Sequence, residues 1–295
     1  MSATIAYAVR SANRDVPDEN PDVTEEFASR GDPRRTLELL WGVDQPSTRG
    51  PRPGLDVATI VRAAIELADV DGLGAVSMRK VAERLGRSAM SLYTYVPGKA
   101  ELLDLMVDTL HAELPTEPLS GGWRAAAEAF ARTQWDWYLS HPWMLQIAGA
   151  RVVLGPHELD AYEALLRIFD GLGLPPVEVA RSANALGGFV RGSAKAVSDA
   201  RSAEQATGIS DDDWWNARAP ILDELTVGVW DERYPVSSKL AAEQAFDQLD
   251  RPDDSLPYTV RDAYDTFEFG LQRMLDGFAA HIDARAKKPG KRARR

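Results

Sequence analysis

The side chains of this chain that could do covalent chemistry do not complete a catalytic set. Ser77-Met-Arg-Lys80 has the spacing of an acyl-transfer nucleophile, but neither Ser-Asp-Asn nor Lys-Thr-Gly follows it. The run Asp211–Asp213 lacks the last carboxylate of a metal-binding Asp-Asp-x-x-Asp, because Trp215 occupies that position. The four histidines are too scattered to form a His-x-x-x-His pair. The sequence therefore predicts no enzyme, no metal site and no cofactor.

Hydroxyl and cationic side chains are instead concentrated between residues 77 and 99. Hydroxyls of serine, threonine and tyrosine suit phosphate oxygens and base edges, and arginine and lysine suit phosphates. Lys99 begins a predicted helix, where the helix dipole disfavours a cation unless a phosphate lies nearby. The pattern indicates a surface that binds DNA.

Short helices are expected to position that surface. Apolar periodicity and N-cap residues predict helices at about 56–71, 77–85, 88–95 and 99–111. Gly86 lies between the second and third helices, as the tight turn of a helix-turn-helix requires. Leu92 is the apolar residue of the third helix that points back into the domain, so its other residues are left to face DNA.

The rest of the chain is also predicted to be helical. Helices are expected at about 123–140, 157–171, 176–206, 211–226, 238–249 and 259–284, and no period-2 strand pattern is found. The fold class is all-α, with an N-terminal three-helix helix-turn-helix domain and a larger helical ligand-binding and dimerisation domain. The expected divisions are a flexible acidic extension (1–48), the DNA-binding domain with its connecting helix (49–111), the larger domain (112–284) and a basic disordered tail (285–295). Within the extension, Thr36–Trp41 could form a helical turn that packs on the body.

Charge is distributed unevenly along the chain. The net charge of −11 is the sum of −4 for residues 1–48, 0 for 49–111, −14 for 112–284 and +7 for 285–295. A neutral segment presents a positive face when its basic groups cluster, and here they cluster around residues 79–99. The chain has no cysteine, no apolar run of about 20 residues and no signal-peptide pattern, so we expect a cytoplasmic protein that does not enter a membrane.

Residues 55–111 closely resemble the DNA-binding domain of the TetR (tetracycline-repressor) family. The matching motifs are Ile60-Val-x-Ala-Ala-x-x-Leu67, Gly72-Leu-x-x-Val-Ser-Met-Arg79, Val81-Ala-x-x-Leu-Gly86 and Ser88-x-x-Ser91-Leu-Tyr-x-Tyr95-Val-x-x-Lys99. The resemblance implies phosphate contacts from Tyr93, Tyr95 and Lys99, with Ser77 and Arg79 clamping the backbone. It also implies a base-reading set of Ser88, Ala89, Ser91 and Thr94. Arg49 and Arg52, just upstream, could enter the adjacent minor groove.

A fainter resemblance to the C-terminal domain of the tetracycline repressor is visible in residues 150–155, 162–165 and 185–192. It implies a ligand cavity in which His111 keeps a pocket histidine. The metal-binding histidine is replaced by Val153, a pocket asparagine by Phe130 and a pocket glutamine by Ile168, so a magnesium–tetracycline chelate is not the expected inducer. The remaining candidate lining residues are Gln134, Trp135, Tyr138, Trp143, Met144, Phe169, Asn184 and Phe189. Aromatic residues at helical spacing more often belong to a core than to a pocket, and that alternative stays open.

Two apolar stripes could form a dimer seam. They consist of Trp214, Trp215, Ile221 and Leu222 in one helix and Tyr264, Phe267, Leu271, Met274, Leu275 and Phe278 in the last helix. The same stripes could instead be intrachain core. The expected function is a homodimeric repressor that a small apolar or aromatic molecule releases from near-palindromic operator DNA. The alternative is a helical small-molecule binding protein or enzyme that no longer uses its helix-turn-helix.

Overall fold

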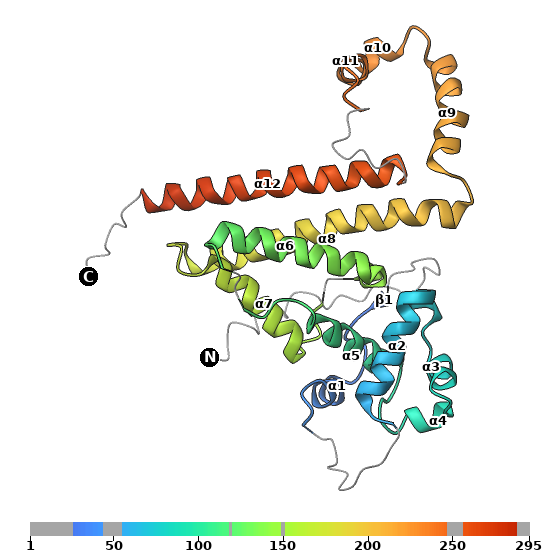
Figure 1. Cartoon of the computed structure of the whole chain (residues 1–295), viewed down its shortest axis with the longest axis vertical. Helices are drawn as coiled ribbons and strands as arrows, with labels where there is room; N and C mark the ends of the chain where they lie inside the picture. The colour runs from blue at the N-terminus through green and yellow to red at the C-terminus, as the bar shows by residue number, and fades with distance from the viewer. Residues whose placement is uncertain (1–25, 44–54, 118–119, 149–150, 247–255, 288–295) are drawn as a thin grey trace, which may run out of the picture.

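A computed structural model describes residues 26–43, 55–117, 120–148, 151–246 and 256–287 (Figure 1). The described elements are β1 (Glu26–Phe27), α1 (Pro33–Leu40), α2 (Val57–Asp71), η1 (Leu73–Ala75), α3 (Met78–Arg84), α4 (Ala89–Leu92), α5 (Lys99–His111), α6 (Trp123–Ser140), η2 (Pro142–Gln146), β2 (Ile147–Ala148), α7 (Pro156–Phe169), α8 (Pro176–Thr207), α9 (Asp211–Thr226), α10 (Trp230–Arg233), α11 (Pro235–Ala242) and α12 (Tyr258–Ala286). The all-α prediction is confirmed. The elements that were not predicted are the 3-10 helices η1 and η2, the short helix α10 and a two-residue parallel pair in which β1 lies beside β2.

The long helices α8 and α12 run side by side, with α6 against them (Figure 1). Helices α2, α3 and α4 lie together on the side of the body away from α12, and α5 leads from them into the body. No helix in the described ranges is both long and apolar enough to cross a membrane.

Local sequence explains the boundaries of the first helices. The Asp56 carboxylate accepts a hydrogen bond from the backbone N–H of Thr59 at 2.7 Å and so caps α2. The hydrogen bonds from Thr59 lower the pKa of Asp56. Gly86 ends the α3 region with a φ of 63°, a left-handed conformation that glycine adopts without strain.

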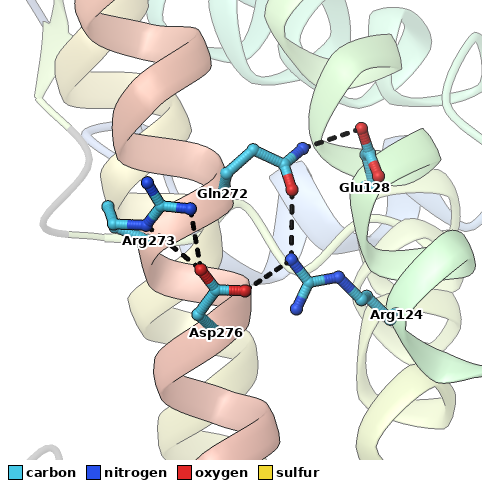
Figure 2. Close-up of polar contacts among 5 residues, drawn as sticks. All are labelled: Arg124, Glu128, Gln272, Arg273 and Asp276. Atoms are coloured by element: carbon cyan, nitrogen blue, oxygen red, sulfur yellow. Dashed lines mark hydrogen bonds and ion pairs between the residues drawn. The ribbon is translucent and has the colours of Figure 1, made fainter.

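Polar contacts join α6 to α12 beside their apolar seam. Figure 2 shows Arg124 of α6 donating to Asp276 at 2.8 Å and to Gln272 at 3.1 Å, while Gln272 donates to Glu128 at 3.0 Å. Arg273 holds Asp276 from within α12. These groups are partly exposed, so their contribution to stability is small.

Residues 28–43, here called the N-terminal strap, differ from the predicted flexible extension. Ala28 and Leu40 are buried, and the backbone N–H of Ser29 donates to Asp104 of α5 at 2.7 Å. The Trp41 indole donates to the carbonyl oxygen of Leu154 at 3.1 Å. The anticipated helical turn at Thr36–Trp41 lies mostly within α1. Acidic composition did not prevent packing, because the strap buries apolar side chains and its N–H groups find acceptors on the body.

The segment α9–α11 extends away from the body beyond the end of α8 (Figure 1). None of the residues of these three helices is buried. The helix predicted at 238–249 has other bounds in the structure: α11 begins at Pro235 and ends at Ala242, and a turn follows at residues 243–246. Residues 247–249 lie outside the described residues.

Candidate DNA-binding and effector-binding sites

Helices α3 and α4 are anchored by their apolar sides. Val81 of α3 and Leu92 of α4 are fully buried, as is Val96 just after α4. Ser77 caps α3, its hydroxyl oxygen accepting the backbone N–H of Lys80 at 3.3 Å. The anchoring leaves the opposite side of α4 to face solvent.

The exposed side of α4 carries most of the predicted reading residues. Ser88 and Thr94 are exposed, Tyr93 is 46% exposed, and the Ser91 hydroxyl donates to the carbonyl oxygen of Ser88 at 2.6 Å. Two predicted contacts, Ala89 and Tyr95, are partly buried and pack against the core. The α-helix ends at Leu92, and a turn replaces its predicted last residues up to Tyr95.

Met90 was not among the predicted reading residues, yet at 77% its exposure is the highest given for a large apolar residue of this domain. An apolar side chain at this place suits contact with a thymine methyl group.

Cations surround this surface. Arg79 pairs with Glu83, and Arg84 pairs with Glu66, each at 2.9 Å and exposed to solvent. Such pairs are weak, so an approaching phosphate can compete for the guanidinium groups. Lys99 is the first residue of α5 and follows Gly98, whose backbone is extended. Arg49 and Arg52 lie outside the described residues.

The predicted effector-lining aromatics form packed clusters within the body. The Trp135 ring stacks on Phe267 with 3.7 Å between centroids, and the Phe189 ring also stacks on Phe267, with 5.9 Å between centroids. Phe169 meets Phe278 edge-on at 5.2 Å. The other apolar and aromatic candidates are buried as Trp135 is: Phe130, Tyr138, Trp143, Met144, Val153 and Ile168. In this structure these side chains are therefore core.

Three polar candidates have different environments. His111 uses Nδ1 to contact the carbonyl oxygen of Val107 at 2.7 Å, and its ring lies 5.1 Å from that of Trp137. Burial lowers the pKa of His111, which favours neutral imidazole with Nδ1–H donating and Nε2 left as an acceptor. The Gln134 Oε1 atom is buried without a hydrogen-bond donor. Asn184 is exposed and accepts the Tyr162 hydroxyl at 3.1 Å.

The dimer prediction needs a correction for the last helix. Phe267, Leu271 and Leu275 are buried in the protomer's own core, where α12 packs on α6 and α8, so they are not available to a second chain. Tyr264, Met274 and Phe278 are partly buried and pack against the same core. Periodicity identified an apolar stripe correctly but could not tell which neighbour covers it. Trp214, Trp215, Ile221 and Leu222 are exposed on α9.

Both parts of the chain match descriptions of known domains. Residues 60–106 match the bacterial regulatory proteins of the tetR family, and residues 114–282, more than half of the chain, match the tetracyclin repressor-like C-terminal domain. The chain belongs to the TetR family. It is accordingly a ligand-responsive, DNA-binding transcriptional repressor and not an enzyme. The alternative of a binding protein or enzyme that has abandoned its helix-turn-helix is not favoured.

Relatives of this TetR-family protein include the HTH-type transcriptional repressor DrrR1 of Streptomyces coeruleorubidus. It is 40% identical over 262 residues, which cover 88% of this chain and 90% of the relative. An HTH-type transcriptional regulator of Saccharopolyspora erythraea is 35% identical over 57% of this chain and 71% of its own length. Among solved structures, ActR of Streptomyces coelicolor in complex with actinorhodin has a TM-score of 0.61 and 27% identity, covering 78% of this chain and 98% of ActR. ActR in complex with (S)-DNPA has a TM-score of 0.58.

Proposed function

We propose that this repressor acts in the cytoplasm as a homodimer that binds a near-palindromic operator. The exposed side of α4, with Ser88, Tyr93 and Thr94 beside the cations of α3, is the observation that carries this proposal. Two such faces in a two-fold dimer would enter successive major grooves about 34–36 Å apart on one side of the duplex. Specific binding is expected at a Kd of roughly 10⁻⁸–10⁻¹¹ M.

The contacts to DNA divide into two kinds. Phosphate contacts fix the orientation of the protein on the duplex, and they come from Tyr93, Tyr95, Lys99, Ser77 and Arg79. Base edges are read by residues of α4 and its flanks, namely Ser88, Ala89, Ser91, Thr94 and, added from its exposure, Met90.

The outer faces of α8 and α12 are the proposed dimer seam. The long helices lie together at the end of the body away from the DNA-binding domain (Figure 1). Phe269 of α12 is 65% exposed, and Gly188 and Gly192 of α8 are exposed, so the two helices offer one large apolar group and a surface that a helix can approach closely. Trp214 and Trp215 of α9 extend the apolar surface beyond this seam.

The effector is a small, mainly apolar or aromatic molecule that carries hydrogen-bond donors. The buried candidates on α6 and α7 offer apolar and aromatic contacts, whereas Gln134 Oε1 and the neutral His111 both present acceptors. ActR binds actinorhodin and (S)-DNPA, which supports an organic effector for this chain as well. Because the aromatic clusters are closed in this structure, effector entry requires them to move apart.

Selection of bound sequences from random duplex DNA, at a stated salt concentration, tests the proposal. Recovery of a two-fold symmetric motif is the expected result. Salt-sensitive binding without any enriched motif would contradict operator recognition. Sedimentation of the protein with the selected duplex then gives the number of chains bound, and a single chain per duplex would contradict the dimer.

A further inference from the structure

Asp69 joins the DNA-binding domain to the body through one carboxylate oxygen. The residue lies in the last turn of α2, and its Oδ1 atom accepts the Trp143 indole N–H at 2.7 Å. The same oxygen lies 2.7 Å from Nδ1 of His141, the residue that ends α6. Nε2 of His141 is in turn 3.2 Å from Glu113, just beyond α5. The segment at residues 141–143 thus contacts the end of one DNA-domain helix directly, and Glu113 joins the cluster through His141.

Losing the hydrogen bond between the Trp143 indole and Asp69 is unfavourable, because the indole N–H is buried. Trp143 is 1% exposed, and a buried indole N–H that has no acceptor destabilises the folded state. An ionised carboxylate is also a stronger acceptor than a neutral group. The position of the Trp143 ring and the position of α2 are therefore linked.

The short helix η2, which contains Trp143, is held from its other side by α8. Arg191 of α8 donates to the carbonyl oxygens of Met144 at 3.2 Å, Leu145 at 3.3 Å and Ile147 at 2.6 Å. Because Arg191 binds backbone atoms of η2 and Asp69 binds its tryptophan side chain, η2 bridges the rigid long helices and the DNA-binding domain.

We propose that Asp69 is the positioning residue that couples η2 to the orientation of the DNA-binding domain. The proposal rests on the proposed function and extends its effector site to η2, because Trp143 and Met144 are among the candidate lining residues. An effector that shifts the Trp143 ring withdraws the indole N–H from Asp69 and releases the end of α2. Coupling between two sites is reciprocal, so operator binding must also alter η2.

Hydrogen–deuterium exchange of the full chain, with and without the operator duplex recovered by selection, measures this effect at residues 141–147. Asp69→Ala removes the shared acceptor, and Asp71→Ala is the matched control, because it removes the same charge at the end of the same helix from an exposed position. We expect operator binding to change the exchange rate of this segment at least threefold in the wild type and in Asp71→Ala. In Asp69→Ala the change should disappear while the operator is still bound.

Other outcomes overturn the proposal. An unchanged operator effect in Asp69→Ala, or no effect in the wild type, shows that α2 and η2 are not coupled through this carboxylate. If Asp69→Ala fails to fold, Asp69→Asn retains the side-chain shape with a weaker, neutral acceptor and should reduce the operator effect; an undiminished effect overturns the proposal equally. Failure to select any operator is a separate result, seen earlier, which removes the proposed function and this coupling with it.

Discussion

The Trp135 indole of α6 stacks on the Phe267 ring of α12 with 3.7 Å between ring centroids and 16° between the planes. Phe267 is 2% exposed, whereas Phe269, two residues further along α12, is 65% exposed. The last helix therefore has one aromatic face in the core of its own protomer and another available to a partner.

Substitutions at Phe267 and Phe269 allow the contribution of α12 to protomer folding to be measured separately from its contribution to dimerisation. Phe267→Ala should lower the free energy of unfolding by about 3–5 kcal/mol, because it removes a large buried ring from a stacked cluster. Phe269→Ala should leave protomer folding nearly unchanged but raise the dimer dissociation constant about tenfold or more. Urea unfolding and sedimentation over a range of concentrations measure the two effects. Equal behaviour of the two variants would rule out the proposed seam.

Lys99 provides a test of phosphate contact. Lys99→Ala should weaken binding to all duplexes to a similar degree and reduce the slope of log K against log salt by about 1, since one phosphate contact is lost. Fluorescence anisotropy at several salt concentrations gives the slope. Lys239→Ala, on the distant α11, is the control and should behave as the wild type. An unaltered slope for Lys99→Ala would remove the residue from the phosphate contacts.

We expect Gln134 to lower the free energy of unfolding while it contributes to effector binding. Its Oε1 atom is buried and has no donor, and a side chain of similar length without that acceptor avoids the cost. Gln134→Met is therefore expected to raise the free energy of unfolding by about 1 kcal/mol and to weaken the response to an effector that carries a hydroxyl donor. Denaturant unfolding tests the first effect without any effector. A destabilised variant would show that the amide is satisfied in the folded protein; Gln146→Met, at an exposed position, is the control.

Asp104 makes the stability of the strap depend on pH. Burial raises its pKa above the ordinary value of 3.8, although the hydrogen bond from Ser29 acts in the opposite direction and the charge of Glu101 adds to the rise. The folded state therefore holds the proton more tightly than the unfolded state, so stability from this group falls as pH rises from 3.8 through the raised pKa.

Asp104→Asn removes that dependence and keeps an acceptor for Ser29. We expect its melting temperature at pH 7.5 to exceed that of the wild type by about 2–4 °C, the shift that about 1 kcal/mol produces in a chain of this size. The difference should shrink as the pH approaches 3.8. Thermal unfolding at a series of pH values measures it, and a difference that does not vary with pH would exclude titration of Asp104 as the cause.

The sequence by itself determined the longer helices, their order and the DNA-binding domain, but not short elements such as α10 and η2. Capping at Asp56, the left-handed glycine at position 86 and the apolar residue Leu92 are local features, and local features specify helix ends and the buried side of a short helix. The family motifs are likewise contiguous in sequence, so the function could be predicted without coordinates.

Only the tertiary structure decided which neighbour each apolar face meets. A stripe such as Phe267-Leu271-Leu275 has the same periodicity whether it faces its own core or a partner. The strap is a similar case, because its attachment to α5 depends on a backbone N–H of Ser29 meeting a carboxylate 75 residues away. The contact of Asp69 with Trp143 spans 74 residues and has no periodic signature. Such contacts depend on how distant segments pack. The residue types and their spacing along one segment do not specify that packing.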